Sequence, residues 1–382
     1  MFVLFGVAIG FPWNALISST TFYEHRLGDM SLSTLESVLT FAYFGMNLLG
    51  YAYLHLCGPG AEMVRTHSRY ISSYFAINLV SFSIMTFSPL LPGVDIFWLV
   101  VVVGAVLGAS SALYQHEMFA LSAQVEGATQ EFVFGFAIAG FLASLCSLLT
   151  RSVASAGLTA GLNFGMTVAS LLAAAGLFIR HKSKYMGDDN GDVVAVAADN
   201  SYLQEDEETG EDAEKEDLPD IRWFLLVLGN VMCGTLMVFP AVVAGIKPTE
   251  QSVNAQQFTS ILFVLFNAGD LIGRGIAHRT LSWASPKLLA GMSVARLVVL
   301  LPTFACNREQ SVTDASPLED GLVYGLVLCI GVTGGMLFSA AASRAPSALP
   351  QDPSKAGKLV ALAVAVSLVL GAVLGSLVVA ML

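Results

Sequence analysis

The chain has 382 residues, of which 55% are hydrophobic and 12% are charged, and its mean hydropathy is +0.70. Soluble domains carry about 25% charged residues, so this composition excludes a water-soluble enzyme, a disordered protein and a disulfide-stapled secreted module. It predicts a membrane protein with many spanning segments, and the lipid bilayer is therefore its first expected partner.

The formal net charge of −11 comes from one segment. Residues 185–220 hold 14 of the 29 acidic residues and one base, Lys215, which gives −13, whereas the rest has 15 acids and 17 bases, or +2. Because no basic stripe could neutralise phosphates, nucleic acid polymers are not expected as partners. The five cysteines stand singly, so the sequence predicts neither a metal site nor a disulfide framework, and no cofactor is expected.

Eleven largely apolar stretches approach the length of about 20 residues that crosses a bilayer. In chain order they lie at 2–21, 35–56, 70–91, 96–118, 132–150, 158–179, 223–244, 257–277, 287–305, 321–342 and 357–381. The first has no basic n-region and no small-residue cleavage site, so we interpret it as a mature helix rather than a signal peptide.

The acidic segment 185–220 is expected to be a disordered cytosolic linker, because it lacks the apolar residues that build a core. It separates an N-terminal bundle of six spans, residues 1–184, from a C-terminal bundle of five, residues 221–382. The expected fold is therefore all-α, with two bundles around a central cavity, which is the usual plan of a secondary transporter.

The distribution of lysine and arginine predicts the orientation. With a cytosolic N-terminus, the inside loops hold twelve of these residues, with Lys358 counted among them, and the outside loops hold four. We therefore expect the linker in the cytosol and the C-terminus outside. The expected location is the plasma membrane.

Glycines recur in pairs four residues apart, which puts both on one helix face and lets a neighbouring backbone come close. The pairs are Gly104/Gly108, Gly269/Gly273, Gly331/Gly335 and Gly371/Gly375. They serve either tight packing, the commoner reason, or sliding surfaces during alternating access.

Four ionisable residues fall within apolar spans, where each costs at least about 2.5–3.5 kcal/mol to insert. They are Glu117, Asp270, Arg274 and Arg296. Asp270 and Arg274 are four residues apart and so share a helix face, with Asn267 close to the same face. In one interpretation, Asp270 and Arg274 neutralise each other's charge, which makes their insertion into the membrane tolerable. In the other, these two residues and Asn267 border a cavity and bind the polar atoms of a neutral ligand.

The other two ionisable residues each allow two interpretations. Arg296 either is a second cation near Asp270 or snorkels to the membrane boundary. Glu117 either ends a helix in the cytosol, exposed, or is a buried carboxylate that binds a proton, and in that case it is the candidate proton site of a proton-coupled carrier.

Trp13 lies in the middle of the first span beside Pro12, although tryptophan in membrane helices prefers the interfaces. Its ring either packs in a core or stacks on a flat aromatic ligand, a contact worth about 1–3 kcal/mol for a base. Phe239 precedes Pro240 in the seventh span, and both prolines would kink their helices and free backbone groups toward a wet cavity. The chain has no Walker loop, HExxH or GxSxG sequence, so no enzymatic activity is predicted.

Several segments together resemble the equilibrative nucleoside transporter family over essentially the whole chain. They are GFPWNALISSTTFYEHRL in the first span, MVFPAVVAGIKP in the seventh, FNAGDLIGRGIA and ARLVVLLPTFACN in the eighth and ninth, and AGKLVALAVAVSLVLGAVLGSL in the last. The resemblance implies a helical fold like that of the major facilitator superfamily. It also implies facilitative movement of a nucleoside or nucleobase by alternating access, or a proton-coupled form in which protons are a second partner.

The resemblance further implies a set of substrate-binding residues. They are Trp13, Asn14, Ile17, Phe44, Asn47, Ser111, Gln115, Phe239, Phe263, Asn267, Asp270, Arg274 and Leu368. Gln115 is expected to hydrogen-bond the base, and Asp270 and Arg274 are expected to hold the ribose hydroxyls.

The chain departs from the family pattern at three places, which leave the base preference and proton coupling open. They are His116–Glu117 in the fourth span, Gly135–Phe136–Ala137 in the fifth and Thr333–Gly334–Gly335 in the tenth. The competing function from another class is a membrane receptor that transports nothing.

Overall fold

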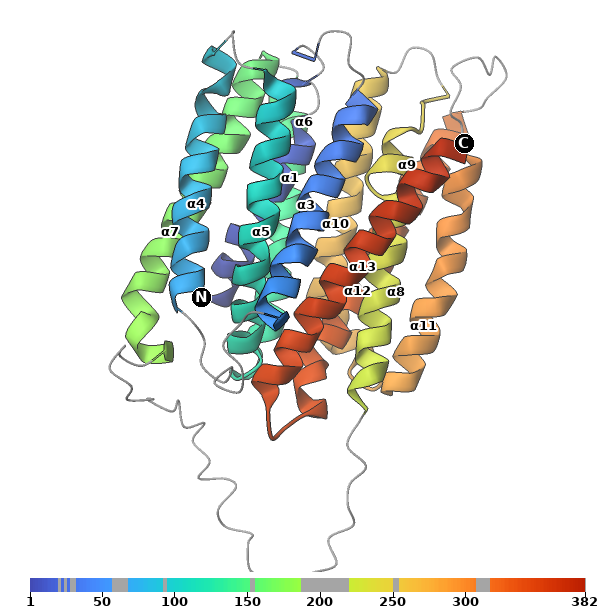
Figure 1. The fold of residues 1–382 in the computed structure, drawn as a ribbon. Coiled ribbons are helices and arrows are strands. Elements are labelled where there is room, and N and C mark those ends of the chain that lie inside the picture. The colour runs from blue at the N-terminus through green and yellow to red at the C-terminus, as the bar shows by residue number, and fades with distance from the viewer. Residues whose placement is uncertain are drawn as a thin grey trace, which may run out of the picture.

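The computed structural model describes residues 1–381 except for 20–21, 24–25, 28–31, 57–67, 92–94, 152–154, 187–219, 250–253 and 307–316. All the regular secondary structure of these described residues is helical (Figure 1). The expected cytosolic linker falls almost wholly outside them.

The long helices form two sets, one on each side of that linker in the sequence. The first set is α1 (Phe2–Ser18), α3 (Leu32–Leu56), α4 (Ser68–Phe87), α5 (Ile96–Ser122), α6 (Ala128–Arg151) and α7 (Ala156–Met186). The second set is α8 (Ile221–Val238) with the short α9 (Ala241–Ala244), then α10 (Ala255–Leu281), α11 (Pro286–Leu300), α12 (Pro317–Arg344) and α13 (Pro353–Met381). Each of the eleven predicted stretches coincides with one of these helices, and α8 with α9 makes up the seventh.

Nine of the described helical segments are long and apolar enough to cross a membrane by length and composition. The other two are α1, which has 17 residues, and α3, which has 25 residues but is not apolar enough to meet the same standard. The lower hydropathy of α3 follows from side chains such as Glu36, Thr40 and Asn47.

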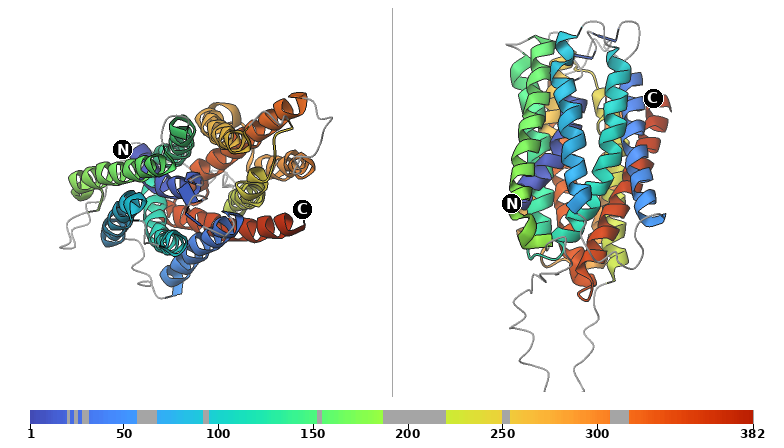
Figure 2. Two further views of the ribbon diagram at one scale, coloured as in Figure 1. Left: turned by 90° about the horizontal axis from the view of Figure 1, so that it is seen from above. Right: turned by 60° about the vertical axis from the view of Figure 1, so that its left-hand side comes forward.

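The helices stand side by side along one common direction (Figures 1 and 2). The end of α7 and the start of α8 lie at the lower end in Figure 1, which we call the linker end. Side-chain caps begin two helices there: Asp220 accepts a hydrogen bond from the Arg222 backbone nitrogen at 2.9 Å, and Ser285 accepts one from Leu288 at 3.2 Å. The bond to Arg222 lowers the pKa of the exposed Asp220 carboxyl.

All four glycine pairs pack against helices of their own set. Gly269 and Gly273 of α10 face Gly331 and Gly335 of α12, and a Cβ on Gly331 would lie 2.9 Å from the Asp270 backbone nitrogen. The pairs of α5 and α13 likewise face α3 and α8. These contacts support the packing interpretation, since alternating access needs motion between sets rather than within one.

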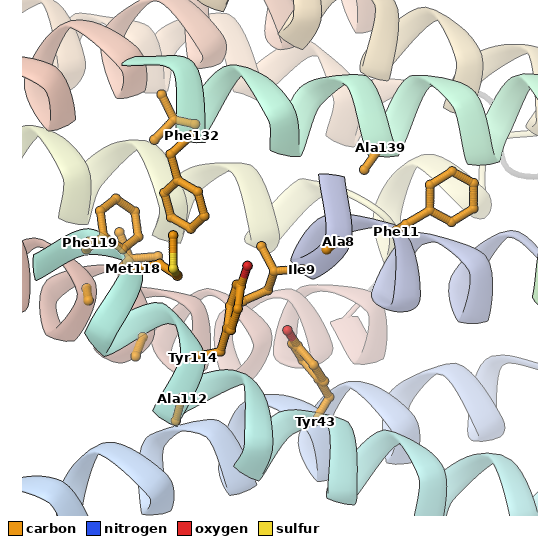
Figure 3. Close-up of a cluster of buried hydrophobic side chains, with 14 of the residues drawn as sticks. Ala8, Ile9, Phe11, Tyr43, Ala112, Tyr114, Met118, Phe119, Phe132 and Ala139 are labelled. Atoms are coloured by element: carbon orange, nitrogen blue, oxygen red, sulfur yellow. The ribbon is translucent and has the colours of Figure 1, made fainter. Parts of the chain in front are cut away.

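Buried tyrosines fix α1 inside the first set (Figure 3). Tyr43 and Tyr114 project toward α1 from α3 and α5, and the Tyr114 hydroxyl donates to the Phe5 carbonyl at 3.3 Å. Tyr74 of α4 donates to the Ala8 carbonyl at 2.9 Å, and its ring stacks on Tyr114 with centroids 4.4 Å apart. The first helix is therefore held by hydrogen bonds to its backbone as well as by apolar packing.

Candidate functional site

Asp270 and Arg274 form the predicted ion pair on α10. The Arg274 Nε donates to Asp270 Oδ1 at 3.1 Å, and Nη2 lies 2.9 Å from Oδ2, so the guanidinium holds the carboxylate with two nitrogens. Arg274 is 8% exposed and its guanidinium lies 4.7 Å from the ring centre of Phe338 of α12. The pair therefore lies inside the protein rather than against lipid.

The third arm of the same guanidinium reaches the first helix set. Arg274 Nη1 donates to the Val133 carbonyl of α6 at 2.7 Å. The ion pair is thus also a contact between the two sets, near the linker end of α10 and α6.

The amides of Asn14 and Asn267 converge on Gly140 of α6. Each side chain donates its nitrogen to its own helix, Asn14 to the Gly10 carbonyl at 2.8 Å and Asn267 to the Phe263 carbonyl at 2.9 Å. A Cβ on Gly140 would lie 3.4 Å from the Asn14 oxygen and would clash with the Asn267 oxygen. Three helices, α1, α6 and α10, therefore bring two acceptor oxygens to one place. Sequence reasoning did not identify Gly140, because a lone glycine in an apolar span carries no signal of what it faces.

Trp13 lies against the aromatic side chains of α3. Its ring stacks on Tyr43, with centroids 4.4 Å apart and planes at 23°, and lies 5.1 Å from the ring of Phe44. Trp13 is half-buried and Ile17, one turn further along α1, is buried. The structure therefore brings the predicted Trp13 and Phe44 together, and it adds Tyr43, which was not predicted.

The predicted polar residues of α3 and α5 are buried beside this aromatic group. The Tyr51 hydroxyl donates to Gln115 Oε1 at 3.4 Å, and Ser111 lies next to the Tyr43 hydroxyl. Asn47 donates to the Gly108 carbonyl at 3.1 Å, which ties α3 to α5.

The predicted residues of the seventh and eighth spans form a second aromatic group. Phe239 stacks on Phe266 with centroids 3.9 Å apart, and it lies 4.8 Å from Phe263. These three rings belong to a different apolar cluster from the one that contains Phe44 and that the half-buried Leu368 packs against. The structure thus divides the predicted apolar contacts between two clusters.

Arg296 is 3% exposed, so the interpretation that it snorkels to the boundary is wrong. Its Nε donates to the Thr333 hydroxyl of α12 at 3.2 Å, and its Nη2 donates to the Thr235 hydroxyl of α8 at 3.0 Å. It also interacts electrostatically with Asp270, as the other interpretation expected. Its hydrogen-bond partners lie on helices far apart in the sequence, so no local pattern could have revealed them.

Glu117 is 1% exposed, so the interpretation as an exposed helix end is wrong. Its Oε1 lies 3.3 Å from the His116 ring nitrogen Nδ1. Lys358, counted among the loop cations from the sequence, lies in α13 and is 6% exposed, and its ammonium interacts electrostatically with Glu117 and Asp352. This charge cluster joins α5 of the first set to α13 of the second.

A small cavity lies between the sets, next to Pro240, whose kink was expected to face a wet cavity. It has a volume of about 80 Å³ and is bounded by α3, α8 and α13, with Glu36, Thr40 and Pro240 among its lining residues. Among the described residues, no group of three or more potential metal ligands is found.

Three comparisons with known proteins bear on this architecture. The solved structure of the proton:xylose symporter XylE of the major facilitator superfamily, bound to 6-bromo-6-deoxy-D-glucose, is similar with a TM-score of 0.59 and 12% identity, over 99% of this chain and 86% of that one. The transporter FucP of the same superfamily, in the outward conformation, is similar with a TM-score of 0.54 and 12% identity, over 99% and 97%. These likenesses show the fold, which is that of a major facilitator. No curated protein sequence matches the chain.

The family comparison goes further than the fold. The profile of a nucleoside transporter family matches residues 100–380, which is well over half of the chain. With its apolar helices and its major facilitator fold, the protein is therefore an integral, multi-pass membrane transporter, and it belongs to the nucleoside transporter family that its sequence motifs resemble.

Proposed function

We propose that the protein moves nucleosides, nucleobases or both across the membrane by facilitative alternating access. The observation that carries the proposal is the position of the Asp270–Arg274 pair. It is fixed on α10 of the second set, yet one arm of its guanidinium ends on a backbone carbonyl of the first set. A group placed at the seam between two helix sets can exchange that bond for one to a solute when the sets separate.

The chemistry of the pair suits a sugar with neighbouring hydroxyls. The Asp270 carboxylate only accepts hydrogen bonds and the Arg274 guanidinium only donates them, so together they satisfy both roles of a hydroxyl. A ribose hydroxyl would replace the Val133 carbonyl as the partner of Arg274 Nη1. The amide oxygens of Asn14 and Asn267, which meet at Gly140, add acceptors close by.

The base is assigned to the aromatic side of the site. Trp13 is half-buried, so part of its ring can stack on a planar base. Gln115, on α5, offers an amide to the edge of the base, and Ser111 lies one turn before it. Because this set contains both donors and acceptors, it does not by itself favour purines over pyrimidines.

Alternating access requires that contacts between the two sets break in turn. At the linker end these contacts are the bond from Arg274 to Val133, the charge cluster of Glu117 and Lys358, and the close approach of Gly357 to the Phe119 carbonyl. In the proposed cycle residues 1–184 and 221–382 move as two bundles. The linker end faces the cytosol and the C-terminus lies outside, in the plasma membrane.

A proton-coupled form of the same transport is the second candidate. It rests on the buried Glu117 carboxylate beside His116, at a seam that must open during the cycle. Coupling predicts that uptake rises when the external pH falls and that a protonophore removes the rise. Uptake that is the same at two external pH values, with and without the protonophore, would leave the facilitative form.

The decisive experiment is uptake of radiolabelled adenosine and hypoxanthine into vesicles that contain the purified protein. We expect saturable uptake, mutual competition, and a loss of at least tenfold in Arg274→Ala, because the proposed ribose donor is removed. The matched control is Arg279→Ala, which removes an exposed arginine from the same helix. Wild-type vesicles that take up neither solute would contradict the proposal and favour a receptor that transports nothing.

A further inference from the structure

We infer that Arg296 is a positioning residue for the Asp270–Arg274 pair, and this inference rests on the function proposed above. Arg296 lies on α11, a helix that carries none of the predicted ribose contacts, and it is buried. A buried arginine is costly unless its donors are satisfied and its charge is compensated, so what it contacts indicates what it does.

The guanidinium of Arg296 joins three helices. Besides its bonds to Thr333 and Thr235, Nη2 donates to the Ile330 carbonyl of α12 at 3.1 Å, and Nη1 lies 3.5 Å from the Val231 carbonyl of α8. All of these acceptors are uncharged hydroxyls and carbonyls. They satisfy the donors of Arg296 without neutralising its charge, which therefore acts on the Asp270 carboxylate.

Two glycines leave the space that this side chain occupies. A Cβ on Gly334 would lie 2.8 Å from Arg296 Nη2 and 3.4 Å from Cζ, and one on Gly234 would lie 3.7 Å from Nη1. Any larger residue at position 334 would push the guanidinium away from its acceptors.

The next residue of the same helix meets the ion pair. A Cβ on Gly335 would lie 2.9 Å from the Asp270 Oδ1 and 3.1 Å from the Arg274 backbone nitrogen. The three consecutive residues Thr333, Gly334 and Gly335 therefore contact Arg296 on one side and Asp270 on the other. The bond from Arg296 to Thr333 fixes the position of α12, and with it the contact between Gly335 and Asp270. The positive charge of Arg296 also attracts the Asp270 carboxylate, in addition to the attraction from Arg274.

Loss of Arg296 is expected to weaken the binding of the sugar and not that of the base. Without Arg296, the carboxylate would keep Arg274 as a partner but lose its fixed position, so the binding of ribose hydroxyls should weaken while that of the base should not. Arg296→Gln is expected to raise the KM for adenosine about five- to tenfold. The KM for 2′,3′-dideoxyadenosine, which lacks both hydroxyls, should stay within about twofold. Arg296→Lys keeps the charge and should recover part of the loss.

Arg344→Gln is the matched control. Arg344 is also an arginine of the second set that donates to carbonyls, those of Leu281 at 3.2 Å and Ala284 at 2.7 Å. Its loss should reduce stability without changing the ratio of the two KM values. An equal rise in both KM values in Arg296→Gln, or no rise in either, would overturn the positioning role while leaving the transport function intact.

A second measurement needs no substrate and so remains informative if the proposed function fails. Unfolding of purified Arg296→Gln, Asp270→Asn and the double variant in detergent forms a double-mutant cycle. We expect the double variant to lose less stability than the sum of the two single variants. Additive losses would show that Arg296 and Asp270 are not coupled, and would overturn the inference.

Discussion

The two kinds of helix seam in this protein differ in what fills them. Between α10 and α12, within the second set, glycines bring backbone against backbone, and a Cβ on Gly273 would lie 2.8 Å from the Met336 nitrogen. Between the two sets, the described contacts at the linker end add charged side chains, Arg274 on Val133 and Lys358 with Glu117, to one close backbone approach, that of Gly357 to the Phe119 carbonyl. Closely packed backbones have no side-chain hydrogen bond that could pass to another partner, whereas a polar side chain can replace its protein partner by water or a solute. The comparison supports the proposal made above, in which α10 and α12 move together and the two sets separate at the seam between them.

The largest expected effect comes from a side chain forced into the backbone seam. In Gly331→Val the new Cβ would meet the Asp270 nitrogen at 2.9 Å and would also clash with the Phe266 carbonyl. Neither helix can yield without losing its own packing, so we expect no folded protein in a detergent size-exclusion profile.

The control for this variant is Gly325→Val on the same helix, where a Cβ would meet nothing within 4 Å. It should yield folded protein at about the wild-type level. Normal folding of Gly331→Val would show that the α10–α12 seam is not rigid, and the contrast between the seams would fail.

A smaller effect is expected when a charge is removed from the seam between the sets. Lys358→Met takes away a cation that interacts with the buried Glu117, and His116 stays as its neighbour. Removing the charge that compensates a buried carboxylate costs about 3 kcal/mol, which reversible unfolding in mixed micelles would measure.

The double variant Glu117→Gln/Lys358→Met sharpens this result. Because it removes both charges together, it should recover most of the lost stability. A double variant that is as unstable as Lys358→Met would mean that the loss arises from packing around α13 rather than from the uncompensated charge of Glu117.

The smallest effect is expected from a substitution beside the proposed substrate contacts Asn14 and Asn267. Gly140→Ala would place a methyl group against the amide oxygens of Asn14 and Asn267, and both are ends of side chains that can turn aside. We expect folded protein and a rise of about two- to fivefold in the KM for adenosine. Gly45→Ala, which meets nothing within 4 Å on α3, is the control, and equal KM values in both variants would remove Gly140 from the site.

The sequence predicts what depends on neighbours along the chain. Helix spans follow from apolar length, and the Asp270–Arg274 pair follows from a spacing of four residues, so both are confirmed. Burial was one of two interpretations left open for Glu117 and Arg296, and Lys358 was counted among the loop cations, because burial depends on which helices pack together. Lys358 is instructive: it is the second residue of the predicted span 357–381, where a cation is typical of the membrane boundary, yet it lies inside α13 and is buried.

The rigid seam has a consequence for the direction of transport. Asp270 and Arg274 lie on α10, which packs closely against α12 through glycines, and Arg296 of α11 donates a hydrogen bond to Thr333 of α12. In the proposed cycle, the ribose contacts therefore move together as a rigid group, and only the contacts of this group with the first helix set change. A permeant arriving from either face of the bilayer meets the same constellation. In the facilitative form proposed above, the KM values for influx and efflux should then be alike, and the concentration gradient of the permeant should set the direction of net transport.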